Sequence, residues 1–203
     1  MKQTQNNNKK AALSAECRED IKQAIEVMNR GGVILYPTDT IWGLGCDATN
    51  EEAVRRIFEI KKRADSKALI TLVDSEVKVE SYVRDVPEVA WDLIELSEKP
   101  ITIIFDGARN LAPNLQAEDG SIGIRVTREA FSRELCMRMK RAIVSTSANV
   151  SGQPSPRNFS EISEEILSAV DYVCTSRREE KETATASSII KLGAGGEISI
   201  IRE

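Results

Sequence analysis

Short apolar runs alternate with amphipathic segments along most of the chain, and this alternation limits the folds available to it. Runs rich in β-branched residues predict strands at residues 33–37, 68–73, 101–105, 122–126, 142–144, 171–174, 188–192 and 198–201. The spacing of apolar residues predicts helices at 16–29, 50–62, 87–96, 128–141 and 161–170. We therefore expect an α/β fold with a single twisted mixed (parallel/antiparallel) sheet and flanking helices, in which the late strands pair antiparallel.

Histidine is absent from the 203 residues, and its absence excludes several classes of site. Ser-His-Asp and Cys-His nucleophile systems and zinc sites that need imidazole are ruled out. The four cysteines are far apart in sequence and form no Cys-x-x-Cys pair, so a zinc cluster or dithiol redox centre is not expected. We interpret them as small buried side chains, and we predict no metal site made by the protein alone.

The length suits one domain, which we place at residues 14–203, behind a flexible polar tail at residues 1–13. No apolar run reaches the ~18 residues that a membrane span needs, and the first residues do not resemble a secretory signal. We therefore expect a cytoplasmic protein that does not bind membranes and keeps its thiols reduced.

Two basic runs occur in a chain whose net charge is −4. Residues 55–67 and residues 125–141 each contain six Lys or Arg against two acidic residues. Local positive charge on an acidic protein suits an anionic ligand, such as a nucleotide or an RNA phosphate chain. A solvated helix face is the alternative interpretation, and the composition of these runs leaves both open.

The cluster Lys61-Lys62-Arg63 ends the helix predicted at 50–62. Lys61 falls on the apolar face of that helix, so it either extends along the edge of the core or points into a cavity. Several basic donors at this junction could bind a phosphate. They could equally complement the helix dipole, and the pattern alone does not decide.

Two further segments carry candidate ligand groups. Residues 145–149, Ser-Thr-Ser-Ala-Asn, follow a predicted strand directly, at the position where open α/β sheets bind ligands, although they could also form a turn that bonds its own backbone. Asp39 is either a catalytic carboxylate or an Asx-turn residue, and its setting favours the turn. Arg125 points away from the apolar face of its strand and needs a carboxylate partner, from the protein or from a substrate.

In order and spacing, these segments resemble the YrdC-like family. The motifs are Tyr-Pro-Thr-Asp-Thr at 36–40, Gly-Leu-Gly-Cys-Asp at 43–47, Lys-x-Arg at 61–63, Ser-Ile-Gly-Ile-Arg-Val at 121–126 and Ser-x-Asn at 147–149, and the resemblance covers residues 20–202. It implies a YrdC/RibB-like sheet with a large concave basic cavity. It also implies a nucleotidyltransferase activity that converts L-threonine, bicarbonate and ATP into threonylcarbamoyl-AMP and pyrophosphate, for threonylcarbamoyladenosine modification of tRNA.

The resemblance also implies roles for individual residues. Threonine would be bound by Thr40, Arg125, Ser145 and Ser187, with Arg125 on its carboxylate. Lys61 and Arg63 would be the catalytic residues on the phosphates of ATP, which would be held further by Lys67, Ser121, Ser147, Asn149, Ser155 and Arg202. Mg²⁺ would be held through the phosphates of ATP. The nitrogen of threonine is the nucleophile, so no general base is assigned.

The chain departs from the family pattern in places. Leu72 stands where some members carry a threonine-contacting histidine, and a charged segment at 177–186, a candidate lid, replaces a glycine- and proline-rich one. Downstream threonylcarbamoyl-transferase proteins and tRNA are the expected partners. The main alternative is a diverged, non-catalytic RNA-binding protein. A carbamoyltransferase of hydrogenase maturation would need zinc-finger and acylphosphatase segments, which this length and cysteine spacing exclude.

Overall fold

The computed structural model describes residues 13–62, 69–181, 185–193 and 195–203. The predicted tail, apart from Leu13, therefore lies outside the described residues, as do Arg63 and Lys67. The helices are α1 (Ala15–Asn29), α2 (Glu51–Lys61), α3 (Val79–Tyr82), α4 (Val89–Leu96), α5 (Ala130–Met139) and α6 (Glu164–Ala169). The strands are β1 (Ile34–Tyr36), β2 (Gly43–Gly45), β3 (Ile70–Val73), β4 (Ile101–Phe105), β5 (Ile122–Val126), β6 (Ile143–Ser147), β7 (Tyr172–Val173), β8 (Ser188–Leu192) and β9 (Ile198–Arg202).

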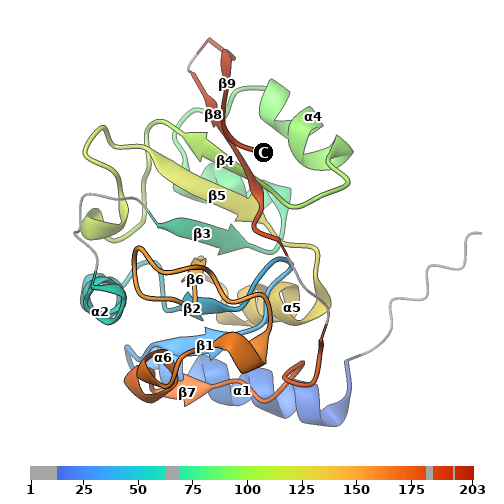
Figure 1. Cartoon of the computed structure of the whole chain (residues 1–203). Coiled ribbons are helices and arrows are strands. Elements are labelled where there is room, and N and C mark those ends of the chain that lie inside the picture. The colour runs from blue at the N-terminus through green and yellow to red at the C-terminus, as the bar shows by residue number, and fades with distance from the viewer. Residues whose placement is uncertain (1–12, 63–68, 182–184, 194) are drawn as a thin grey trace, which may run out of the picture.

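Within the described residues, the strands form one mixed sheet in the order β7-β1-β2-β6-β3-β5-β4-β8-β9 (Figure 1). The pairs β7–β1, β3–β5 and β4–β8 are parallel, and the other neighbours are antiparallel. The expected mixed sheet is thus confirmed. Of the late strands, β8 and β9 pair antiparallel as predicted, whereas β7 lies at the opposite edge of the sheet.

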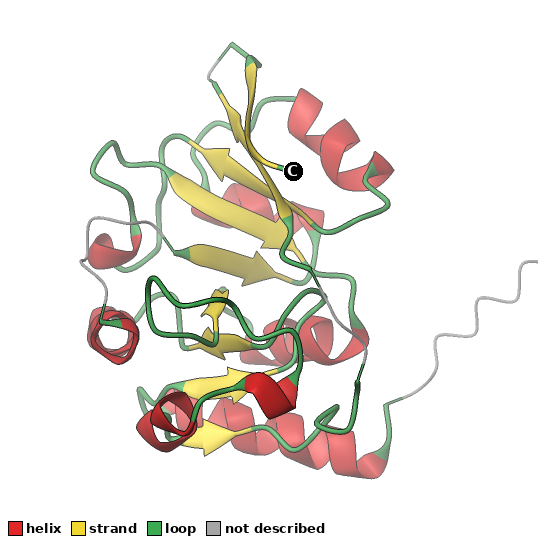
Figure 2. Cartoon of the chain, in the orientation of Figure 1, coloured by secondary structure: helices red, strands yellow, loops and turns green. Residues whose placement is uncertain are grey.

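Helices cover both faces of this sheet. Adjacent residues of β6 show this, because Ile143 belongs to a core cluster with α1 and α5, whereas Val144 belongs to another cluster with α2 and α4. Neighbouring residues of a strand point to opposite faces, so the two clusters lie on opposite sides of the sheet. Figure 2 shows that the long segment between β6 and α6 is mostly loop. None of the described residues forms a helix long and apolar enough to cross a membrane.

Two differences from the predicted strands bear on the site. Strand β2 was not predicted, because two of its three residues are glycine. A Cβ at Gly45 would lie 2.6 Å from a ring atom of Tyr36, so glycine is required for this close packing. Strand β6 continues through Ser147, which places the first hydroxyls of the Ser/Thr run on the sheet itself.

The end of α2 fixes the position of Lys61. Asn50 caps the helix at its start by accepting a hydrogen bond from the Ala53 amide. Lys62 ends the helix in the left-handed conformation, with φ of 49°. Lys61, one residue earlier, is buried with the apolar residues of the helix, as its place on the apolar face predicted.

Candidate functional site

A cavity of about 240 Å³ opens where the ends of several strands meet. Its lining comes from the β1–β2 turn, the start of β3, the ends of β5 and β6, and strands β8 and β9. Seven of the residues predicted to bind substrates line it together: Thr40, Arg125, Ser145, Ser147, Ser155, Ser187 and Arg202. Residues that are up to 162 positions apart in the sequence, the separation of Thr40 and Arg202, therefore converge on one space.

Arg125 occupies the floor of this cavity, and its side chain is only 4% exposed. Its Nη2 lies 3.0 Å from the Asp39 carboxylate and donates a hydrogen bond to the Thr40 hydroxyl at 3.3 Å. Its Nε is buried and has no hydrogen-bond partner among the described residues. A buried donor without an acceptor is costly, so the guanidinium is set up to receive an acceptor from a ligand.

The turn before β2 differs from the prediction made for Asp39. Thr38, not Asp39, forms the local turn, because its hydroxyl accepts a hydrogen bond from the Thr40 amide at 3.0 Å. Asp39 instead forms the ion pair with Arg125, without an aligned hydrogen bond at Oδ1. Burial raises the pKa of Asp39, and the nearby Arg125 only partly opposes this. The preference for an Asx turn at Asp39 was therefore wrong.

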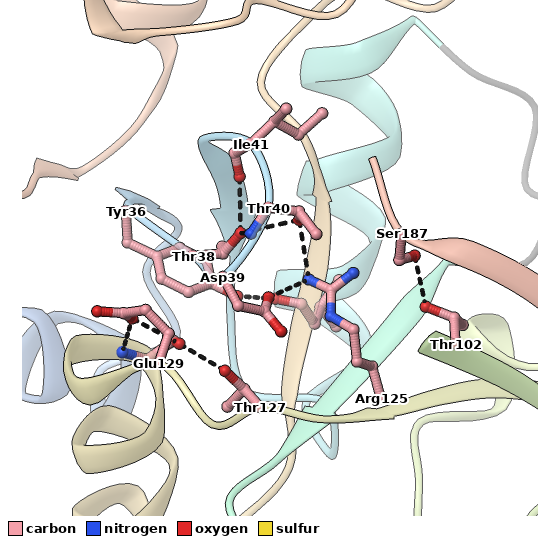
Figure 3. A network of polar contacts seen from close by, with 12 residues as sticks. Tyr36, Thr38, Asp39, Thr40, Ile41, Thr102, Arg125, Thr127, Glu129 and Ser187 are labelled. Carbon is pink, nitrogen blue, oxygen red and sulfur yellow. Dashed lines mark hydrogen bonds and ion pairs between the residues drawn. The ribbon is translucent and has the colours of Figure 1, made fainter. Parts of the chain in front are cut away.

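Ser187 forms the opposite side of the cavity from Thr40. Its hydroxyl lies 2.8 Å from the Thr102 hydroxyl, and its carbonyl accepts two hydrogen bonds from Arg202, at 3.0 and 2.7 Å. Burial lowers the pKa of Arg202, and the positive charge of Arg125 lowers it further. Figure 3 shows Arg125 between Asp39 and Thr40 on one side and Ser187 and Thr102 on the other.

Lys61 holds the loop that follows β6. Its ammonium group donates to the carbonyls of Ser147 and Asn149, at 2.6 and 2.7 Å. The Asn149 side chain in turn donates to the carbonyls of Val150 and Gln153. Lys61 and Asn149 thus shape the loop behind the cavity wall, whereas Ser147 of the same loop lines the cavity.

The remaining predicted residues are not brought to this cavity by the described structure. Ser121 lies at the start of β5, the end opposite Arg125, where its amide bonds the Asp119 carboxylate at 3.0 Å. Arg63 and Lys67 lie outside the described residues. The contribution of these three residues to ATP binding stays a prediction.

Thr102 was missed as a site residue. A hydroxyl within the otherwise apolar strand β4 was the available signal, since its buried position requires a partner, and Ser187 provides it. Leu72, at the position where some family members have histidine, pairs with Arg125 in the β3–β5 register and is fully buried. It belongs to the core cluster that contains residues of α1 and α5, and it does not line the cavity.

The described part of the chain contains no second candidate site made of thiols or metal-binding side chains. The four cysteines are free thiols, three of them buried. Burial raises the pKa of the Cys46 and Cys136 thiols, as expected for small core residues. Across the described ranges, no group of three or more His, Cys, Asp or Glu side chains is arranged to hold a metal ion.

Known proteins resemble this chain over most of its length. A sequence profile of Sua5, YciO and YrdC proteins, described as telomere recombination, matches residues 26–203. A protein of Pseudoalteromonas translucida named threonylcarbamoyl-AMP synthase is 34% identical over 155 residues, which cover 75% of this chain and 83% of the relative.

Solved structures agree with this assignment. E. coli YciO superposes with a TM-score of 0.76 and 26% identity, over 92% of this chain and 89% of that protein. P. abyssi Sua5 complexed with L-threonine superposes with a TM-score of 0.79 and 25% identity over 90% of this chain, which spans about half of that protein (53%). The resemblance and the fold class inferred from the sequence are thereby confirmed, and the chain belongs to the Sua5/YciO/YrdC family.

Proposed function

We propose that this chain is a threonylcarbamoyl-AMP synthase, a nucleotidyltransferase that makes L-threonylcarbamoyl-AMP and pyrophosphate from L-threonine, bicarbonate and ATP. The similarity to a relative of that name, 34% identical over 75% of the chain, carries the proposal. The convergence of seven candidate substrate-binding residues on one cavity supports it. The alternative of a non-catalytic RNA-binding protein is not favoured, because the relatives are named as enzymes.

Threonine binding would centre on Arg125. The substrate carboxylate would accept hydrogen bonds from the guanidinium, whose buried Nε has no partner among the described residues. The hydroxyls of Thr40, Ser145 and Ser187 surround the same space and would fix the rest of the amino acid. With the amine held beside bicarbonate, formation of the carbamate, which releases water, depends mainly on positioning. The carbamate oxygen then attacks the α-phosphorus of ATP, and pyrophosphate leaves.

ATP would lie toward the loop after β6 and the last strand. Ser147, Ser155 and Arg202 line the cavity there, and Lys61 and Asn149 support the loop from behind. We retain Lys61 and Arg63 as the catalytic pair on the phosphates; Lys61 would reach them by exchanging the Ser147 or Asn149 carbonyl for a phosphate oxygen when ATP binds. Lys67 and Ser121 would be further ATP ligands. Mg²⁺ would enter with ATP, because phosphate oxygens are the hard ligands that it prefers. Together, these cations would neutralise charge on the leaving pyrophosphate.

The biological setting follows from the same proposal. The product is a reactive mixed anhydride, so a downstream threonylcarbamoyl-transferase must consume it to modify tRNA. We propose that the protein acts in the cytoplasm, with residues 14–203 as the catalytic unit, and that direct contact with tRNA is secondary. Many arginines of the second basic run already contact protein groups: Arg125, Arg128, Arg133, Arg138 and Arg141.

The decisive test is pyrophosphate release by the purified protein with ATP, Mg²⁺, L-threonine and fresh bicarbonate. We expect release that requires both threonine and bicarbonate, together with threonylcarbamoyl-AMP detected by mass spectrometry. Arg125→Gln should abolish the threonine-dependent release of pyrophosphate. Arg109→Gln serves as a control, because this exposed arginine bonds the Glu80 carbonyl away from the cavity. Release that is absent, or independent of threonine, would contradict the proposal.

A further inference from the structure

Asp39 is a largely buried carboxylate for which the proposed reaction has no task. Its side chain is 11% exposed, and it immediately precedes Thr40, a proposed threonine ligand. A carboxylate in such a place is costly to bury unless a positive charge compensates it. Its compensating charge is Arg125, the residue proposed to bind the carboxylate of the substrate.

The contacts of Arg125 are divided between the protein and the cavity. Asp39 and Thr40, two consecutive residues of one turn, both engage a single guanidinium nitrogen, Nη2, at 3.0 and 3.3 Å. No hydrogen bond from Nε or Nη1 to another described residue is present. Because the guanidinium is a rigid planar fork, fixing Nη2 also fixes the direction of the other two donors.

Asp39 approaches the guanidinium from outside the substrate cavity. It is not among the residues that line that cavity. It lines instead a second, smaller hollow of about 100 Å³, next to Pro100 and Arg128. Asp39 therefore touches Arg125 without reaching the space where the substrate would lie, so its effect on a ligand must pass through Arg125.

We propose that Asp39 is a positioning residue that holds the Arg125 guanidinium by Nη2, so that its remaining donors stay directed at the carboxylate of the amino-acid substrate. This inference rests on the proposed function. An arginine side chain has many rotamers, and without Asp39 it must be ordered by the substrate itself. The binding of threonine should therefore weaken selectively, whereas ATP, which is held by other residues, should be affected little.

The test compares Michaelis constants of Asp39→Asn for the two substrates. The substitution keeps the shape of the side chain but removes the charge that holds Arg125. Removing a residue that orients a metal ligand typically lowers metal affinity by about 10- to 100-fold, and by analogy we expect a rise of this order in KM for threonine. KM for ATP should stay within about twofold. Asp39→Glu, which keeps the charge on a longer side chain, should give an intermediate KM for threonine.

Asp47→Asn is the matched control. Asp47 is also a buried carboxylate paired with an arginine, at 3.2 Å from Arg141, but it does not line the cavity. We expect its KM values to equal those of the wild type. If Asp39→Asn fails to fold, Asp39→Glu carries the test, and its intermediate rise in KM should likewise be confined to threonine.

Two results overturn the inference while leaving the proposed function intact. One is a wild-type KM for threonine in the Asp39 variants, and the other is an equal rise in both KM values, which indicates general damage. Loss of the proposed function itself is recognised separately, because the wild-type protein would then release no threonine-dependent pyrophosphate.

Discussion

Replacing Lys61 tests the link between helix α2 and the loop that carries Ser147. Lys61→Met keeps an unbranched side chain of similar length within the apolar environment of the helix end, but it removes the ammonium group. The carbonyls of Ser147 and Asn149 then lose a charged donor. We expect both a less stable protein and a displaced loop at the cavity wall.

The size of the effect follows from the contacts. Hydrogen bonds from a charged donor contribute about 1.5–3 kcal/mol each, and to described residues Lys61 makes two at 2.7 Å or less. Part of the loss in the variant is offset, because methionine carries no charge that must be desolvated when the protein folds. We therefore expect a loss of about 2–4 kcal/mol in the free energy of unfolding. For a chain of this length, that lowers the Tm by roughly 5–15 °C.

Thermal and urea unfolding measured by circular dichroism would give the stability, and pyrophosphate release would give KM for ATP. Lys62→Met is the matched control, since among the described residues the neighbouring ammonium forms only an exposed ion pair, with Glu165. Such surface pairs contribute about 0–1 kcal/mol, so its Tm should hardly change. Equal Tm values for the two variants would refute the view that Lys61 anchors the loop.

Two further perturbations address the segment after β7. Arg177→Leu removes a hydrogen bond of 2.9 Å to the Thr38 carbonyl, and the loss of about 1 kcal/mol should raise KM for threonine about fivefold. Arg178→Leu, which leaves that turn untouched, should not change KM for threonine. Equal KM values for the two variants would contradict the role of Arg177. Burial alone would raise the pKa of Asp20, but hydrogen bonds from Ser176 and two neighbouring donors lower it below its ordinary 3.8. The ionised carboxylate therefore stabilises the fold fully at pH values above its ordinary pKa. This stabilisation is lost as the pH falls through the lower pKa of the folded state. Asp20→Asn should be less stable at pH 7 and lose less stability between about pH 5 and pH 2, as urea unfolding would show; parallel pH profiles would disprove this.

The order of elements could be predicted from the sequence where local pattern and tertiary packing agree. Strands β4, β5 and β8 occur at the predicted residues, because their apolar runs are continuous and bounded by turns. Strand β2 could not be predicted, since its glycines have low strand propensity and are required only by the packing of Tyr36. The distant pairing of β7 with β1 likewise depends on contacts that no local pattern reveals.

The site was predictable in its members but not in its internal contacts. The family motifs identified the residues that converge on the cavity, yet motifs do not show which side chains contact one another. Asp39 illustrates this, because its neighbours in sequence favour a turn, whereas its partner Arg125 lies 86 positions away. Lys61 shows the reverse, since the helical period alone placed its side chain on the buried face.

Local charge explains how a chain with net charge −4 can hold anionic substrates. Among the described residues, two arginines line the cavity, Arg125 and Arg202, and Asp39 pairs with Arg125. The lowered pKa of Arg202, caused by partial burial and by the positive charge of Arg125, is consistent with repulsion between these two cations. A carboxylate or phosphate placed between them removes that repulsion. The acidic surface does not prevent this, because exposed charges are screened within about 10 Å at ordinary salt concentrations, whereas the buried Arg125 guanidinium is screened much less.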